Sequence, residues 1–260
     1  MNKKHLLFIP VYNCEKQIIR VIEKIIKSLI INNFEEIIVI DNNSTDNTFT
    51  VVRNIINEKK LVKFKLFQNK ENYNLGGTHK TGFNYAIDNN FDYVTILHGD
   101  DQGDINNLEN VFKNEKYKDY DCCLGSRFAR DSKLVNYPKF RIYANYMINL
   151  AASIVSFKFL TDLGSGLNMF KVSFLKNKFY LNFPNGLTFN YCLMFYICDV
   201  NSKFFYFPIL WREDDQVSNV KLFSHFFKWL DIMFKFVFTR KRLFQNKLLR
   251  DKEYVFKKFK

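Results

Sequence analysis

The sequence predicts an α/β fold with a mainly parallel central sheet flanked by helices. Short apolar runs alternate with longer segments whose apolar residues recur at helical spacing. This alternation is typical of parallel strands joined by right-handed helical crossovers. Polar clusters follow the first, second and fourth apolar runs. Because the carboxyl ends of parallel strands meet at one edge of a sheet, where ligands bind in open α/β folds, these clusters predict a nucleotide-sized cleft.

The elements are expected in the following order. A first strand at 6–9 ends at Pro10, and Asn13 caps a helix whose first turn carries Glu15. The continuous apolar run at 36–40 indicates a second strand that is buried on both faces. Then follow a helix through 51–56, a strand at 62–67, a glycine-bearing turn at 72–77, a helix from about 78 to 87, and a buried strand at 93–97.

The segment Tyr93–Asp104 is the centre of the predicted site, because an apolar strand breaks there directly into acidic residues. Gly99 is expected to let the backbone turn sharply where the strand ends. Clustered carboxylate oxygens are the hard ligands that Mg²⁺ or Mn²⁺ prefers. The alternative for this segment is an acidic turn that only solvates a loop.

Composition limits the classes of function. The chain has 260 residues, of which 47% are hydrophobic, including 30 Phe and 14 Tyr, so it is not a disordered protein. Its net charge of +13 predicts an anionic partner, either nucleic acid, lipid headgroups or a phosphorylated substrate. The basic residues are scattered or lie near the C-terminus, and no zinc-finger or RNP-type motif occurs. A nucleic-acid-binding module is therefore the least favoured class.

The cysteines and apolar windows bear on the cellular compartment. Five cysteines without paired spacing predict free, buried thiols in a reducing compartment. The apolar run near the N-terminus is too short for a signal peptide. The uncharged windows at 142–157 and 179–198 are short or interrupted, whereas a transmembrane helix needs roughly 20 apolar residues. We expect a cytoplasmic protein, at the inner face of the cell membrane if its tail binds lipid.

Six motifs in this order and spacing resemble the family-2 inverting glycosyltransferases, which have the Rossmann-like GT-A fold. The closest subgroup is the dolichol- and polyprenyl-phosphate sugar synthases and related bacterial surface-polysaccharide transferases. The resemblance spans roughly residues 5–220 and implies metal-dependent, inverting transfer from a nucleotide-diphosphate-sugar to a polyprenyl-phosphate or glycan acceptor. The motifs are FIPVYN at 8–13, VIDNNSTDNT at 39–48, NYNLGG at 72–77, LHGDDQ at 97–102, GSRF at 125–128 and DLGSGLNMFK at 162–171.

Position by position, the resemblance implies a donor site and a catalytic group. Asp41 matches the acid that hydrogen-bonds the donor's base. The Asp-x-Asp metal motif falls on His98, Gly99 and Asp100. Asp100 is then the principal ligand of Mg²⁺ or Mn²⁺, and His98 either ligates the metal or orients the loop through a hydrogen bond. The other expected donor-binding residues are Pro10, Val11, Tyr12, Asn13, Asn72, Gly76 and Gly99, and the expected catalytic residues are Asp100, Asp101, Gln102 and Arg127.

On the acceptor side the resemblance leaves two routes open. Asn190 stands where relatives place a carboxylate. Either the acceptor is a phosphate, which is already a nucleophile, or a base comes from Asp162, Glu213, Asp214 or Asp215. A surface salt bridge is the alternative for Arg141, and a solvated loop is the alternative to a lid for 211–218. The expected acceptor-side residues are Arg141, Asp162, Ser165, Gly166 and Arg212.

The composition changes after about residue 219, so we expect a catalytic domain at 1–219 and a basic amphipathic helical tail at 220–260. An aromatic face with a basic flank, Arg240–Arg242, predicts a helix at an anionic membrane surface. Packing on the catalytic domain or in a homodimer is the alternative. A nucleotide-binding scaffold without catalysis is the rival to the enzyme as a whole. The predicted face comprises Leu222, Phe223, Phe226, Phe227, Leu230, Phe234, Val237 and Phe238, opposite Ser224, Lys228, Asp231 and Lys235.

Overall fold

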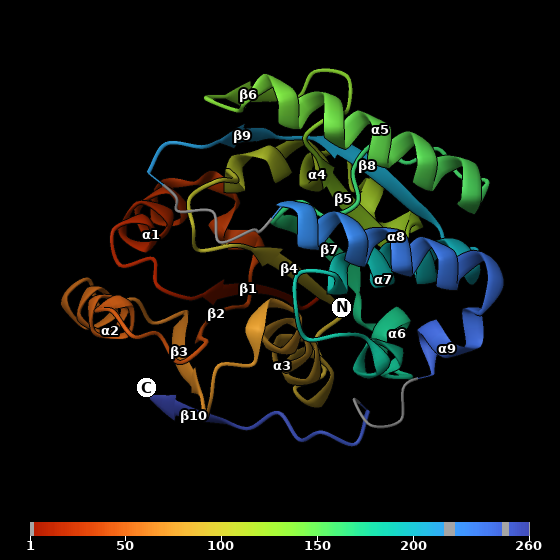
Figure 1. Cartoon of the computed structure of the whole chain (residues 1–260). Coiled ribbons are helices and arrows are strands. Elements are labelled where there is room, and N and C mark those ends of the chain that lie inside the picture. The colour runs from red at the N-terminus through yellow and green to blue at the C-terminus, as the bar shows by residue number, and fades with distance from the viewer. Residues whose placement is uncertain (1–2, 216–221, 246–249, 260) are drawn as a thin grey trace.

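The computed structural model describes residues 3–215, 222–245 and 250–259 (Figure 1). Its centre is an eight-stranded sheet in the order β10-β3-β2-β1-β4-β7-β5-β8. These strands are β1 (His5–Val11), β2 (Glu36–Asp41), β3 (Phe64–Asn69), β4 (Tyr93–Leu97), β5 (Cys122–Ser126), β7 (Leu167–Lys171), β8 (Phe204–Pro208) and β10 (Phe256–Phe259). Two short strands, β6 (Lys133–Val135) and β9 (Leu210–Arg212), form a separate parallel pair.

The direction of the strands confirms the predicted α/β fold. β1 pairs in parallel with β2 on one side and β4 on the other, and β2 pairs in parallel with β3. β7 runs antiparallel between β4 and β5, and β10 runs antiparallel to β3 at the edge. The sheet is therefore parallel where the predicted polar clusters lie and mixed elsewhere.

Helices cover both faces of the sheet (Figure 1). On β1, Leu7 and Ile9 belong to the core that contains α1 side chains, and Leu6 and Phe8 belong to the core that contains α3, α7 and α8 side chains. This alternation is the period of two that a strand buried on both faces requires. The helices are α1 (Gln17–Lys27), α2 (Thr48–Glu58), α3 (Asn74–Asp88), α4 (Glu109–Lys113), α5 (Lys139–Ser156), α6 (Val172–Leu175), α7 (Phe189–Asp199), α8 (Leu222–Phe238) and α9 (Arg240–Phe244).

Several predicted boundaries were wrong. Pro10 lies inside β1 and pairs with Ile40 of β2. The pairing of β1 with β4 already ends at Phe8, so Pro10 lies beyond the ladder on that side. Asn13 has a φ of 48° and does not cap α1, which begins four residues later. Gly76 lies in the first turn of α3 and not in a preceding turn.

Gly99 is required for space and not for its backbone angle. No glycine in the described ranges has a positive φ. A Cβ at Gly99 would lie 2.4 Å from Cγ1 of Val11, so any side chain would push β1 and the end of β4 apart. The left-handed residue of this loop is Asp101, with a φ of 62°.

The C-terminal helix contributes to the main core, as in the alternative in which it packs on the catalytic domain. Trp229, Ile232 and Phe236 of α8 are buried in the same cluster as α7, and Phe236 stacks on Phe195 at 4.5 Å. The unpredicted strand β10 then extends the sheet beside β3. The helix predicted from the apolar spacing between 222 and 238 is present as α8.

A buried lysine connects α3 to the C-terminal region. Lys80 is inaccessible to solvent, and its Nζ donates to the backbone oxygens of Leu181 (3.2 Å) and Phe183 (2.5 Å). It also donates to Oδ1 of Asn185 (2.8 Å) and to the hydroxyl of Tyr254 (3.0 Å). Burial lowers the pKa of Lys80 to about 7. Polar contacts thus fix the 181–185 segment inside an apolar core.

The five cysteines are free and buried, as predicted. In the ranges that the structure describes, we find no helix with the length and apolar character needed to cross a bilayer.

His5 predicts how stability depends on pH. The ring is buried, stacks on Tyr93 at 4.6 Å, and its pKa is lowered to about 4 by burial. On acidification the unfolded chain therefore binds a proton near pH 6.5 that the folded protein does not, so stability falls as the pH drops from 6.5 towards 4. Urea titrations at pH 7 and pH 5 measure this effect. Between these two pH values, the free energy of unfolding of His5→Phe should fall by about 2 kcal/mol less than that of the wild type. An equal loss in both proteins would contradict it.

Candidate functional site

The three predicted polar clusters meet at one edge of the sheet. Hydrogen bonds continue the pairing beyond the strands, from Asn42 N to Val11 O at 2.9 Å and from Gly99 N to Pro10 O at 3.1 Å. Because β2, β1 and β4 are neighbours in this order, the loops that follow them are held side by side. The expected convergence of these segments is thus present.

The loops after β1 and β2 are joined through their side chains. Asn13 N donates to Oγ of Ser44 at 3.0 Å, and Thr45 N donates to Oδ1 of Asn13 at 2.8 Å. Asn47 N donates to Oε2 of Glu15 at 3.0 Å. Tyr12, in the same loop, exposes 40% of its surface and presents an aromatic ring at this edge. The two loops therefore form one rigid wall beside an exposed aromatic group.

Asp41 is completely buried at the end of β2. Its carboxylate accepts hydrogen bonds from N and Oγ of Ser44, the latter at 2.5 Å, and from Nε2 of Gln68 at 3.0 Å. Gln68 was not predicted, because the contact depends on the register between β2 and β3. The acid is thus held in a fixed orientation before any ligand binds.

A network of amides lies beside Asp41. Asn42 Nδ2 donates to Oδ1 of Asn72 at 2.8 Å, and Asn42 Oδ1 accepts from Asn69 Nδ2 at 3.0 Å. The predicted donor residue Asn72 therefore belongs to this edge. Gly76 has a different environment, since a Cβ there would lie 2.6 Å from the backbone oxygen of Pro184 and from Cβ of Phe189. Close packing explains this glycine without a ligand.

His98 is hydrogen-bonded to a second histidine, His79, which the sequence did not indicate. Their Nε2 atoms are 3.1 Å apart. Burial lowers the pKa of both imidazoles, so one neutral ring donates to the other. Gly166 covers His98 closely: its oxygen accepts from His98 N at 2.9 Å, and a Cβ there would lie 2.9 Å from Nδ1. These contacts match the alternative in which His98 orients the loop.

Asp100 lies half-buried between His98 and Gln102, whose N donates to Oδ1 of Asp100 at 3.1 Å. Burial raises the pKa of Asp100, and His98 opposes this effect. The described residues contain no group of three or more His, Cys, Asp or Glu side chains placed to hold a metal. Mg²⁺ and Mn²⁺ are commonly bound by one or two carboxylates together with water and substrate phosphates. Asp100 therefore fits a metal that also binds the phosphates of a ligand.

The neighbouring Asp101 is used differently. It is buried, and its two oxygens accept from Nε of Arg20 at 2.7 Å and from Nζ of Lys24 at 2.5 Å. Arg20 also binds Asp215 at 2.7 Å. The left-handed backbone at Asp101 thus directs its carboxylate into ion pairs with α1, and these contacts give its expected catalytic role no support.

Arg127 and Asp162 form a buried bidentate ion pair. Nε and Nη2 of Arg127 donate to the two oxygens of Asp162 at 2.8 and 2.7 Å, and Arg127 N adds a third bond at 2.9 Å. Burial alone would lower the pKa of Arg127, but Asp162 raises it above its usual value. The guanidinium also lies 5.3 Å from the ring of Trp211. Asp162 is therefore occupied and is not placed to act as a base.

The other acids considered as bases are also engaged. Glu213 accepts from Arg141 at 2.7 and 2.8 Å, so the salt bridge considered for Arg141 is present. Asp214 accepts from Asn136 at 2.8 Å and lies 4.0 Å from Arg212. Asp215 pairs with Arg20, as described above. The backbone of Arg212 nevertheless contacts the loop that carries Asp100, since Arg212 N donates to Gln102 O at 3.0 Å.

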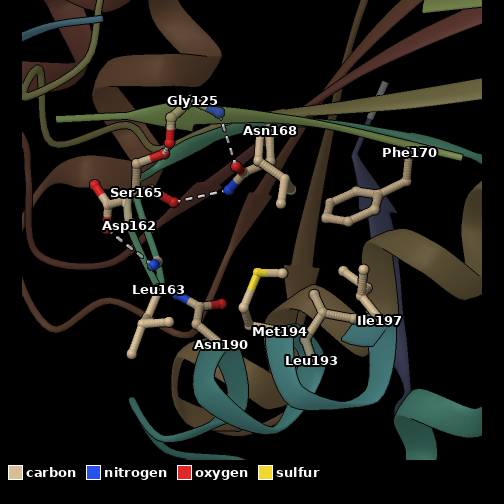
Figure 2. A pocket seen from close by; sticks show the side chains of 12 residues that line it. Gly125, Asp162, Leu163, Ser165, Asn168, Phe170, Asn190, Leu193, Met194 and Ile197 are labelled. Atoms are coloured by element: carbon tan, nitrogen blue, oxygen red, sulfur yellow. Dashed lines mark hydrogen bonds between the residues drawn. The ribbon is translucent and has the colours of Figure 1, made fainter. Parts of the chain in front are cut away.

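Ser165 lines a small cavity of about 20 Å³ between the 162–168 segment and α7 (Figure 2). Its Oγ donates to Gly125 O at 2.6 Å, and Asn168 bridges the same segments, donating to Ser165 O and accepting from Gly125 N. Asn190 and Met194 close the opposite wall (Figure 2). A cavity of this size holds about one water molecule, so it has no room for an acceptor, and the contacts of Ser165 stabilise the loop.

The buried ion pair between Arg127 and Asp162 should contribute to the stability of the fold. Arg127→Met should lower the free energy of unfolding by about 3–5 kcal/mol, because it leaves the Asp162 carboxylate buried and uncompensated. Urea unfolding followed by circular dichroism measures this loss. The double variant Arg127→Met/Asp162→Leu is the control, and it should recover most of the lost stability. Wild-type stability in the single variant would contradict a stabilising role for this ion pair.

Comparison with known proteins agrees with this architecture. The model of the family described as Glycosyl transferase family 2 matches residues 7–179. UDP-N-acetylglucosamine–dolichyl-phosphate N-acetylglucosaminyltransferase of Methanococcus voltae is 25% identical over 183 residues, which cover 65% of this chain and 70% of that protein.

Solved structures share the fold at low identity. S. aureus TarS in complex with UDP superposes with a TM-score of 0.59 and 17% identity, over 88% of this chain and 64% of that one. Glucosyl-3-phosphoglycerate synthase of Mycobacterium tuberculosis, in complex with Mn²⁺, UDP and glucosyl-3-phosphoglycerate, superposes with a TM-score of 0.60 and 14% identity, over 92% and 80% of the two chains. The chain thus spans less than two thirds of the TarS chain.

Proposed function

The chain belongs to glycosyl transferase family 2, and from this premise we propose that it moves a sugar from a nucleotide-diphosphate-sugar to a polyprenyl-phosphate, with inversion at the anomeric carbon. The choice of a phosphate acceptor rests on the observation that no candidate base among the described residues is available. Asp162, Glu213, Asp214 and Asp215 all have partners, and the position considered for a base holds Asn190. A phosphate acceptor needs no base, because its oxygen is already a nucleophile.

The donor would bind against the wall formed by the loops after β1 and β2. Buried Asp41 supplies a fixed hydrogen-bond acceptor for a base N–H, and exposed Tyr12 offers a ring on which the base can stack. Support comes from the UDP complexes of S. aureus TarS and the M. tuberculosis synthase, which have the same fold.

Asp100 would hold Mg²⁺ or Mn²⁺ at the diphosphate, where the cation neutralises charge that develops on the leaving group. His98, held by His79 and Gly166, fixes the loop that carries Asp100. The acceptor oxygen attacks the anomeric carbon from the face opposite the diphosphate, and the bond from that carbon to the diphosphate oxygen breaks as the new bond forms. The nucleoside diphosphate leaves with both bonding electrons.

The lipid-linked acceptor also has support among the relatives. The M. voltae protein is named for transfer to dolichyl phosphate. A role in surface polysaccharide synthesis at the cytoplasmic face of the membrane stays our prediction. A glycan acceptor is the second candidate, and it would require one of the paired acids to be released as a base. A scaffold without catalysis would bind the donor and leave it intact.

Replacement of Asp100 tests whether its carboxylate supports metal-dependent catalysis. Asp100→Asn should lower the rate of metal-dependent donor turnover by at least about a hundredfold, since each 1.36 kcal/mol of barrier is tenfold and a principal ligand supplies several kcal/mol. Release of nucleoside diphosphate with Mn²⁺ is the assay. Asp104→Asn, which removes another acid from the same loop, is the matched control and should stay active. Activity above about half of wild type in Asp100→Asn would refute the metal assignment.

Donor recognition has a separate test. Asp41→Asn should weaken binding of the preferred nucleoside diphosphate, measured by calorimetry without metal, by about 1.5–3 kcal/mol, because a charge-assisted hydrogen bond is lost. Asp92→Asn, at the opposite end of the sheet, is the control for removal of a carboxylate beside β4 and should bind normally. Unchanged affinity in Asp41→Asn would remove this acid from the site.

A further inference from the structure

We propose that the outer faces of α5 and α8 together bind the surface of an anionic lipid bilayer. This surface would bring the enzyme to a lipid-linked acceptor, and in that respect the proposal rests on the proposed function. Binding to the bilayer itself requires neither donor nor acceptor, so it can be measured separately. The two helices contact each other and run side by side on one side of the molecule (Figure 1).

α5 exposes an apolar stripe to solvent. Tyr143, Met147, Leu150 and Ile154 follow each other at helical spacing, and each exposes between 55% and 70% of its surface. Phe157, directly after the helix, is 90% exposed. No charged residue occurs from 142 to 157. Apolar faces of this length on a soluble domain mark an interaction site, and this one was not predicted from the sequence.

α8 has two apolar faces, and only one of them is used by the fold. Trp229, Ile232 and Phe236 are buried in the core. The opposite stripe points to solvent, with Phe227 and Phe234 each at least 60% exposed. It continues through Phe226, Leu230, Val237 and Phe238. Most of the face predicted from the sequence is therefore the exposed one, while Leu222 and Phe223 have side chains outside the described set.

Basic residues lie along the border of this surface. Lys228, Lys235 and Arg242 line a pocket of about 160 Å³ between α8, α9 and the 182–188 segment. Lys235 pairs with Asp231 at 2.6 Å, whereas Lys228 and Arg242 have no carboxylate partner among the described residues. Neither α5 nor the exposed stripe of α8 contains an acid. An aromatic and aliphatic surface with a cationic border is complementary to anionic headgroups above an apolar layer.

Charge also decides between a bilayer and a second copy of this chain. A symmetric dimer through the same face would bring two chains of net charge +13 together and place their basic borders close to each other. A bilayer that contains anionic lipid has the opposite charge. Since no described helix is suited to crossing a bilayer, the two helices would lie in the plane of the interface.

Vesicle co-sedimentation of the full chain tests the surface. The wild type should pellet with phosphatidylcholine vesicles that contain phosphatidylglycerol, and less with phosphatidylcholine alone or at high salt. Met147→Ser/Leu150→Ser/Ile154→Ser on α5 and Phe227→Ser/Phe234→Ser on α8 should each weaken partitioning by at least about tenfold, because they remove apolar area without touching the core. Leu29→Ser/Val62→Ser, which removes apolar residues that are even more exposed but lie outside both helices, should bind like the wild type.

A second arm tests the basic border. Lys228→Gln/Arg242→Gln should lose the preference for phosphatidylglycerol and keep the weaker binding to neutral vesicles. Donor hydrolysis should stay unchanged in every variant, so failure of the proposed chemistry and failure of the proposed surface are distinguishable. The proposal is overturned if the wild type does not bind anionic vesicles, or if the α5 variant binds them normally. Sedimentation of the wild type as a dimer that the α5 and α8 variants dissociate, without vesicle binding, would assign the face to a second copy.

Discussion

The candidate site depends on parallel pairing on both sides of β1. Hydrogen bonds to β2 and β4 fix three strand ends at the same height, and further bonds from Asn42 and Gly99 continue the pairing into the loops. The side chains that follow therefore meet without any contact that is specific to a ligand. Gly99 is the tightest point of this arrangement, because Val11 fills the space of its missing side chain. Such preorganisation would reduce the cost of ordering these loops when the proposed donor binds.

Two acids near the candidate site are held in buried ion pairs that stabilise the fold. Asp101 and Asp162 are both buried in ion pairs, with α1 and with Arg127 respectively. A buried acid that loses its partner is costly, so such pairs resist reuse during a reaction. In the proposed mechanism, Asp41 meets the base and Asp100 the metal at the diphosphate, and the hydrogen bonds described above for both come from uncharged donors. This division favours a chemistry in which the acceptor brings its own negative charge.

The sequence predicted local elements well and long-range pairs poorly. The bounds of β4 agree with its apolar run at 93–97, because a strand buried on both faces leaves an unambiguous pattern. β10 was missed because its four residues, FKKF, pair only at an edge. The partners of Asp101 lie 81 and 77 residues earlier, and no local pattern reports such contacts. His79 gave no signal either, since a single histidine in a helix is more often structural than functional.

The polar cage around Lys80 has a consequence for how the chain reaches this structure. Its acceptors lie 101 to 105 residues away in the 181–185 segment, and 174 residues away at Tyr254. Closing such long loops is slow, so the amine stays hydrated while the local contacts of α3 form. Its water is removed only when both distant segments arrive. We therefore expect the C-terminal region to dock late in folding, together with the dehydration of this amine.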